Sequence, residues 1–482
     1  METTEFLSGV ISPLSKTTCI EGSLTLPQTL PDIGSVLTVL GTAKTDEAAC
    51  SPRGVAVTGR AFFQILYLDT EGSARSFDAQ CAFSAELEGE IDDMTLSTAA
   101  AHIEDIAFKE DTRRVDLRAN LVINAAGGCN KTHSAAACGE DIEKRTSTVD
   151  VSVLKDISHC PCSVSGSILI PQSMPEVKSV LLATGAAQIS STHRDIERIA
   201  VEGEIKLGIV YLGSDKNAPI QYMSESVPFS QIVPLKGEGS AIADCTPARI
   251  SVQIGNEPDT LEYICDMDIS AIMTQKEEVT LLEDAYSTQC CIQPVTSRLT
   301  LCEAVGIDPQ RRVIRTGATI PESCPEASRV LLTTVTPCIE DAQAARGAVM
   351  ISGTLFATVC YTTAEAGIRS AKLALPFETE IAAPVSEGMR VSINAQCEYA
   401  AAEGSGRELE LRACLCFNGI AYSCGEIDMI SALNTSDAPE RDGGILLYFA
   451  DTGETDWDIL KKFRLRENHM KVMGEGRRML MI

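Results

Sequence analysis

Three stretches of the chain alternate apolar and polar residues with a period of two. The apolar set of the first stretch, which includes one glycine, is Val55, Val57, Gly59, Ala61, Phe63, Ile65 and Tyr67. The second set is Ile199, Val201, Gly203, Ile205, Leu207, Ile209 and Tyr211, and the third is Val349, Ile351, Gly353, Leu355, Ala357, Val359 and Tyr361. Because side chains alternate between the two faces of a strand, each stretch is predicted to form a strand that buries this set on one face.

The other residues of these stretches add three predictions. Polar residues fall on the opposite face, which we expect to be in water: Thr58, Arg60 and Gln64 in the first stretch, and Glu202, Glu204 and Lys206 in the second. A glycine in register inside all three strands predicts a bulge or a close approach of another backbone. Turn-forming residues follow, for example at 69–72, so each strand should enter a hairpin. The return strands are expected to reach Phe83, Phe229 and Phe377.

A motif with two prolines precedes each alternating stretch. It reads Leu26-Pro27, Pro31-Asp32 and Val36-Leu37, then Ile170-Pro171, Pro175-Glu176 and Val180-Leu181, then Ile320-Pro321, Pro325-Glu326 and Val330-Leu331. The first proline is expected to end a strand. The second is expected to begin a short helical turn, with the acid that follows in its first turn.

The two-proline motif and the alternating stretch recur three times with matching spacing along the chain, which predicts tandem copies of one domain. We predict three domains of mainly antiparallel β-sheet, at residues 1–158, 159–290 and 291–434. A chain of 482 residues is long enough for several domains of ordinary size. Residues 435–444, which are polar and end in two glycines, are predicted to be a linker.

Residues 445–482 predict a small α+β module. A short apolar strand is expected at residues 446–449. Thr455, followed three residues later by Asp458, resembles a capping box, so a helix should begin there. Ile459 and Phe463 would lie on its buried stripe. Residues 478–482 predict a closing strand that pairs with the first.

Charge is distributed unevenly between these parts. The chain has a net charge of −27, and residues 445–482, with six acids and seven bases, carry +1 of it. The preceding residues therefore form an acidic body of charge −28. Such a body repels nucleic acid and anionic lipid, so we expect no nucleic-acid partner and no membrane insertion. The alternative is that the charge serves only solubility.

The cysteines and the start of the chain bear on its compartment. Nineteen cysteines are scattered over the chain without a framework spacing. The acidic first residues do not resemble an export signal, and no apolar run is long enough to span a membrane. We therefore expect a cytoplasmic protein whose thiols are reduced and act as small buried apolar groups.

Sequence motifs for catalysis are not found. The chain has no glycine-rich phosphate loop and no H-E-x-x-H or G-x-S-x-G motif, so no catalytic residue and no cofactor are predicted. One metal candidate combines Cys129, His133 and Cys138 with His159, Cys160 and Cys162. Its spacing matches no zinc motif, so we expect these to be ordinary core or loop residues and predict no metal site.

The repeated motifs resemble the SPOCS domain of spore-coat morphogenesis proteins from clostridia and their relatives. The resemblance rests on the two-proline motif, the alternating strand that ends in tyrosine, and Leu282-Glu283-Asp284-Ala285-Tyr286-Ser287. It covers about residues 20–435, and the third copy lacks the D-A-Y-S ending. The fold this implies is three tandem SPOCS-like domains.

The C-terminal module resembles LysM, a strand–helix–helix–strand (βααβ) unit with the hallmark Y-x-V-x-x-G-D-T-L-W-x-I-A. The match runs through Tyr448, Gly453, Thr455, Trp457 and Ile459. Asp456 stands where leucine is usual. Because an unpaired buried carboxylate costs several kcal/mol, either Asp456 is exposed or the helix is rotated.

SPOCS repeats followed by LysM are the layout of a clostridial coat protein that interacts with a spore-coat morphogenetic ATPase. The resemblance thus implies a non-enzymatic scaffold that docks to this ATPase at the forespore surface, in the mother-cell cytoplasm. We expect the contact at Tyr448, Gly453, Thr455, Trp457 and Ile459, with Lys461 and Lys462 as a basic cluster. In the alternative, Trp457 packs within its own module and the lysines form a solvated face. The alternative function is a cell-wall protein whose LysM module binds peptidoglycan glycan.

Overall fold

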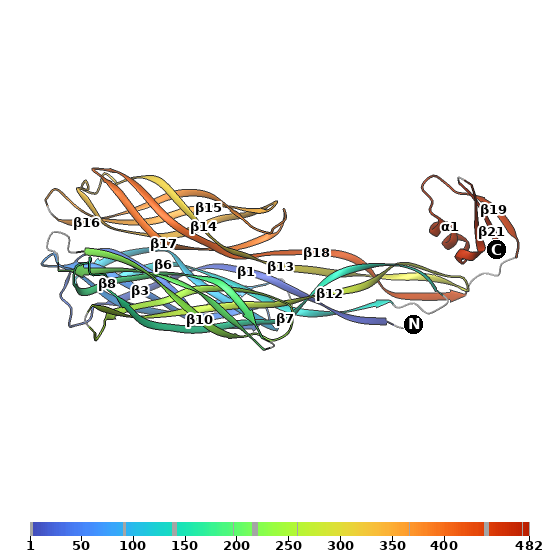
Figure 1. The fold of residues 1–482 in the computed structure, drawn as a ribbon, viewed down its shortest axis with the longest axis horizontal. Helices are drawn as coiled ribbons and strands as arrows, with labels where there is room; N and C mark the ends of the chain where they lie inside the picture. The colour runs from blue at the N-terminus through green and yellow to red at the C-terminus, as the bar shows by residue number, and fades with distance from the viewer. Residues whose placement is uncertain are drawn as a thin grey trace.

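The computed structural model describes residues 3–89, 93–136, 142–195, 197–214, 220–257, 259–365, 367–437, 443–474 and 476–481. Antiparallel β-sheet makes up nearly all of their regular structure, so the prediction of a mainly β protein is confirmed. Within these residues there is one α-helix, α1 (Asp456–Phe463). Figure 1 shows long strands running along the molecule, with the C-terminal module beyond one end of them.

Six strands form the first repeat: β1 (Thr3–Thr25), β2 (Ile33–Ser51), β3 (Gly54–Asp69), β4 (Ala74–Glu88), β5 (Leu96–Asp111) and β6 (Arg114–Ala136). They make two three-stranded sheets, β2-β3-β4 and β1-β6-β5. The first strand of the repeat therefore pairs with its last. One apolar core, with residues of both sheets, lies between them.

The same arrangement occurs twice more. The second repeat contains β7 (Ile142–Leu169), β8 (Val177–Arg194), β9 (Arg198–Gly213), β10 (Ile220–Pro234), β11 (Ser240–Ile254) and β12 (Thr260–Ser287). The third contains β13 (Cys290–Thr319), β14 (Arg329–Ala345), β15 (Ala348–Thr362), β16 (Ile368–Ala382), β17 (Arg390–Ser405) and β18 (Glu408–Asp437). In both, the sheets have the order of the first repeat, β8-β9-β10 with β7-β12-β11 and β14-β15-β16 with β13-β18-β17.

The three alternating stretches are the central strands β3, β9 and β15. The side chains predicted to face the core are buried, and Tyr67, Tyr211 and Tyr361 are fully so. The polar residues Arg60 and Glu202 are exposed on the opposite face, as expected. Period-two alternation thus predicted the core face of these strands. The expectation that the opposite face lies in water is only partly met, because Gln64 is half-buried and donates to the Ala183 carbonyl at 2.7 Å, and Leu66 and Val210 are buried between the repeats.

The strand glycines lie at a close backbone approach in all three repeats. A β-carbon on Gly59, Gly203 or Gly353 would lie 2.1–2.2 Å from a carbonyl oxygen of the neighbouring strand. That strand is bulged at the same level each time, and a ring of Phe83, Phe229 or Phe377 packs over the glycine. The sequence prediction of a bulge or a close approach is confirmed.

The two-proline motif departs from its prediction. The first proline does end the strand, but the turn lies between the prolines, where the Leu30 amide donates to the Pro27 carbonyl at 3.1 Å. The second proline leads directly into β2, so the predicted helical turn after it is wrong. The physical reason is a contact that sequence does not show: the Tyr67 hydroxyl donates to the Pro31 carbonyl at 3.0 Å, and Asp32 pairs with Arg113.

Packing between the repeats makes the body a single unit. A cluster around Leu37, Leu66, Leu182, Val210 and Cys360 draws on equivalent strands of all three repeats. Farther along, each first–last strand pair continues as a two-stranded ribbon, and the three ribbons pack together as a stalk. Its core is lined by Phe6, Ala135, Val151, Leu281, Leu299 and Met429.

The pairing of first with last strands also places the repeats along the chain. The predicted boundary between residues 158 and 159 falls inside β7, whose residues pair with β12 from Leu169 down to Ile142. Motif spacing could not show this, because the strand that opens each repeat carries no repeated motif of its own. Residues 438–442 of the predicted linker lie outside the described residues, and β18 extends to Asp437.

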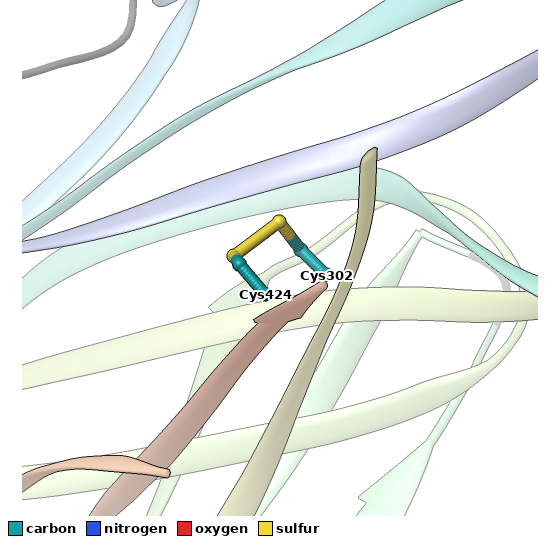
Figure 2. The surroundings of a disulfide bond; sticks show 2 residues. All are labelled: Cys302 and Cys424. Carbon is teal, nitrogen blue, oxygen red and sulfur yellow. A yellow bond between two sulfur atoms is a disulfide. The ribbon is translucent and has the colours of Figure 1, made fainter. Parts of the chain in front are cut away.

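One pair of cysteines corrects the expectation of reduced thiols. Cys302 on β13 and Cys424 on β18 are direct cross-strand partners in the stalk and form a disulfide (Figure 2). The other cysteines within the described residues are free. Those that are buried, such as Cys245, Cys265 and Cys360, pack as small apolar groups in the way the sequence suggested.

The C-terminal module contains β19 (Ile445–Phe449), α1, a 3₁₀ turn at Glu467–His469, β20 (Met470–Gly474) and β21 (Arg477–Met481). Its sheet has the order β19-β21-β20, so the predicted pairing of first and closing strands is present. The predicted βααβ arrangement is corrected to one helix and three strands. The chain turns out of α1 at Arg464, which is left-handed with φ 47°, and by Met470 it is already in a strand.

Candidate docking site of the C-terminal module

Helix α1 begins as its capping box predicts. The Thr455 side chain accepts a hydrogen bond from the Asp458 amide, and the Asp458 carboxylate accepts one from the Thr455 amide at 2.9 Å. At the other end, the Leu465 amide donates to the Leu460 carbonyl at 2.9 Å. The helix buries Ile459 and Leu460 against Leu465 and Leu480. Thr455 and Ile459, two of the predicted contact residues, therefore serve the fold of the module.

Asp456 does not lie unpaired in the core. Its carboxylate accepts a hydrogen bond from Arg478 Nε on β21 at 2.6 Å, and its side chain is 46% exposed. The departure from the LysM pattern is thus accommodated by an ion pair between the helix and the closing strand.

Tyr448 and Lys462 are engaged with each other and with Glu454. The Tyr448 hydroxyl donates to the Glu454 carboxylate at 2.9 Å and accepts from Lys462 Nζ at 2.8 Å. The Tyr448 ring packs edge-on against Phe463, with centroids 5.1 Å apart. Gly453, with φ 90°, lets the chain turn in the loop before α1. These residues shape the loop and the start of the helix.

Trp457 and Lys461 lie on the face of α1 that contacts the second repeat. Trp457 Nε1 donates to Asp284 Oδ2 at 2.9 Å, and Lys461 Nζ donates to both carboxylate oxygens at 2.6 and 2.8 Å. Tyr286 packs edge-on against Trp457, with centroids 5.0 Å apart, and its hydroxyl donates to the Leu465 carbonyl at 2.8 Å. The D-A-Y-S ending of the second repeat is therefore the receiving site for the module.

The local backbone and charges support this contact. Strand β12 is bulged between Leu282 and Asp284, and a bulge changes the direction of the side chains beside it. Arg145 lies over the Trp457 ring, 5.9 Å from its centroid. Burial raises the pKa of Asp284, but the hydrogen bonds from Lys461 and Trp457 outweigh it and hold that pKa below the ordinary value. The carboxylate is thus charged when the module is docked.

Among the described residues, none covers the opposite face of the module's sheet in this way. Ile445, Leu447 and Phe449 of β19 stand across from Met481, Met479 and Arg477 of β21, and Met479 stands across from Lys471 of β20. Residues that are direct cross-strand partners share a face. We call these seven residues the outer face. Leu446, Tyr448 and Leu480 alternate with them and pack inward against α1.

The metal candidate is dispersed. His133 Nε2 lies 2.8 Å from Ser8 Oγ within the stalk, whereas His159 Nε2 lies 3.2 Å from the Thr45 carbonyl where the first two repeats meet. Cys138 lies outside the described residues. No group of three potential metal ligands occurs within the part of the chain that is described. A search of the same residues finds no helix with the length and apolar character of a membrane span.

A cavity of about 190 Å³ lies where the three repeats meet, lined by groups such as Thr42, Thr184 and Gln396. Its carboxylate, Glu398, accepts two hydrogen bonds from Arg311 at 2.8 and 2.9 Å. A salt-bridged acid is not poised as a free base or nucleophile.

The fold and the docking site define a tandem-repeat β protein that carries a small accessory module at the end of its stalk. Residues 176–254 and 326–403 match the family model described as SipL, SPOCS domain. These two segments of the chain are therefore similar to the SPOCS domain. No curated protein and no solved structure match the chain. The two matched segments lie in the second and third repeats.

The sequence did not identify Asp284, Tyr286 or the outer face as parts of a binding site. A signal for the first two was present, because the D-A-Y-S ending occurs in the second repeat alone. A residue that serves only the shared fold would be expected in each copy. The role of Trp457 and its neighbours toward an external partner stays a prediction.

Proposed function

We propose that the chain is a non-enzymatic scaffold of endospore coat assembly. In this proposal it acts in the mother-cell cytoplasm and docks through its C-terminal LysM-like module to a spore-coat morphogenetic ATPase at the forespore surface. The observation that carries the proposal is the division of the molecule. Three SPOCS-like repeats share cores and form one elongated body, and a separate module of opposite charge sits beyond its stalk.

This division suits an adaptor. The long ribbons of the body separate the repeats from the module. The module has a small core of its own around Ile459, Leu460 and Leu480. It can therefore present a binding surface whose orientation the stalk determines.

Binding of the purified ATPase to the full chain and to a chain ending at Gly444 tests the proposal. We expect saturable binding by the full chain and its loss on truncation. Equal binding by both chains would move recognition to the SPOCS repeats. Sedimentation with purified peptidoglycan provides the second arm: binding there, with none to the ATPase, would support the cell-wall function instead.

A further inference from the structure

The C-terminal module has two surfaces on which a partner could bind, and the body covers one of them. Trp457 and Lys461 are both held by Asp284, and Tyr286 closes the contact at the Leu465 carbonyl. A partner could reach this surface only by displacing the body from it. The outer face, on the other side of the sheet, is free of such contacts among the described residues.

The outer face is unusually apolar for a surface in water. Ile445 is 75% exposed, Phe449 60% and Leu447 54%. Four of the fifteen large apolar side chains that are exposed in the described residues belong to the outer face: Ile445, Leu447, Phe449 and Met481. Single exposed apolar residues are normal, but a contiguous group on one sheet indicates a contact surface. Met479 and Met481 add flexible side chains that adapt to a bound surface.

The charges of this sheet have one sign. Strands β19, β20 and β21 contain Lys471, Arg477 and Arg478 and no acidic residue. Arg478 is turned inward to Asp456, which leaves Lys471 and Arg477 on the outer face. The Arg477 guanidinium lies 5.9 Å from the Phe449 ring centroid, at the rim of the apolar group. The surface is therefore apolar at its centre and basic at its edge.

We propose that the outer face is the surface through which the module binds its partner, and that it takes an apolar protein segment flanked by carboxylates. The Trp457 side then has a different task, which is to anchor the module to the second repeat. This inference rests on the proposed function, because it assigns the surface on which that docking occurs. It moves the expected contact from Trp457, Ile459 and Lys461 to Leu447 and Phe449.

Two other occupants fit the surface less well. A second copy would bring four bases of two outer faces together without a carboxylate between them, which is unfavourable. An anionic membrane attracts basic surfaces, but stable recognition of this kind uses clusters of more bases than Lys471 and Arg477 supply. The acidic body, of charge −28, also opposes approach to an anionic surface.

The test uses the full chain and a pair of matched variants. Leu447→Gln with Phe449→Gln alters the outer face, and Asp284→Asn alters the anchor. We expect the double variant to bind the purified coat ATPase at least tenfold more weakly, and Asp284→Asn to bind it within about threefold of the parent chain. Emission of Trp457, the single tryptophan, checks that the double variant keeps its docked fold. Unchanged binding by the double variant overturns the inference and leaves the proposed function standing.

A second probe separates the two proposals. It is a synthetic apolar peptide with glutamates at both ends, compared with the same peptide carrying lysines. The parent chain should bind the acidic peptide at least tenfold more tightly, and the double variant should lose this preference. If the peptide behaves so and the ATPase does not bind, the inference stands and the proposed function falls. Equal binding of both peptides, or stronger binding to vesicles of anionic lipid, overturns the inference.

Discussion

The body and the C-terminal module hold their parts together by different means. Within the body, equivalent apolar residues of three repeats meet in shared cores, and the core-facing side chains of β3, β9 and β15 are almost entirely buried. The module is joined to the body by polar contacts, among them those of Asp284 and Tyr286, the Arg145 guanidinium above the Trp457 ring, and an ion pair between Arg466 and Glu143. Dense apolar packing resists change, whereas a few polar contacts between half-exposed groups are readily exchanged with water. We therefore expect the body to stay folded as one unit, and the contact between module and body to open more easily.

The strand glycines offer the sharpest way to separate the two regions. We expect Gly203→Ala to lower the free energy of unfolding by about 3 kcal/mol, because its β-carbon would lie 2.1 Å from the Gln188 carbonyl oxygen. Gly444→Ala, beside the module, meets no atom within 4 Å and should change it by less than about 0.5 kcal/mol. Chemical denaturation measures both. Equal effects would contradict the tight packing of the body at this point.

The boundary between the first two repeats contains a buried acid with an incomplete set of partners. Asp268 Oδ2 accepts from the Thr45 amide at 2.8 Å, while Oδ1 has no hydrogen-bond partner among the described residues. Burial raises the pKa of Asp268 to about 6, so the folded state retains a proton that the unfolded state has lost. Stability from this group is therefore present at low pH and falls as the pH rises from about 4 to about 6.

Asp268→Asn should accordingly stabilise the body at pH 7, by about 1–3 kcal/mol, since a neutral amide need not be desolvated as an anion. Its free energy of unfolding should also lose the decline between pH 4 and 6. Denaturation curves of parent and variant at pH 4.5 and 7 measure this. A variant less stable than the parent at pH 7 would show that interactions at the boundary compensate the buried charge of Asp268.

The anchor of the module predicts an effect that is confined to the module. Asp284→Asn should weaken docking by about 1–2 kcal/mol, because the hydrogen bond from the charged Lys461 becomes a neutral one. Trp457 emission should shift to the red while the unfolding of the body is unchanged. The pKa of Asp284 is lowered in the docked state, so the parent chain should lose this docking energy as the pH falls through that pKa, below about 4. Asp284→Asn should show no such step.

The smallest expected effect compares two repeats within the body. The Tyr361 hydroxyl donates to the Pro325 carbonyl at 2.8 Å, whereas the equivalent Tyr211 hydroxyl is buried without a partner among the described residues. Tyr361→Phe should cost about 1 kcal/mol in the free energy of unfolding, and Tyr211→Phe should cost nothing or stabilise slightly. Thermal denaturation of the two variants provides the comparison, and equal losses would show that both hydroxyls are bonded alike.

Much of the body could be predicted from the sequence because its information is local and repeated. Alternation within β3 located the core face, and glycine within the same strand predicted the close approach. The boundary at residue 158 was displaced because β7 is identified only by its pairing with β12, whose far end, Ser287, lies opposite Ile142. The prediction of a helical turn after Pro31 was wrong for the same reason, since the Tyr67 hydroxyl on a distant strand donates a hydrogen bond to the Pro31 carbonyl.

The module was predicted less completely. The capping box at Thr455 and the pairing of β19 with β21 rest on short-range signals and are confirmed. A second helix was expected from the LysM resemblance, but the segment after Arg464 is too short for one before β20 begins. The contact of Trp457 with Asp284 joins residues 173 positions apart, and no periodicity within either segment points to it.

The pairing of each repeat's first strand with its last has a consequence for how the chain is made. Thr3 pairs with Ala136, and Ile142 pairs with Ser287, so each ribbon closes only after its entire repeat has left the ribosome. Contacts between residues so far apart in sequence form slowly, because the intervening chain loses conformational entropy before the paired strands gain their hydrogen bonds. Until then β1, β7 and β13 have no partner strand on either edge. Unpaired edges favour pairing with other nascent chains. We therefore expect folding during synthesis to require that β1, β7 and β13 do not pair with other chains before β6, β12 and β18 have been made.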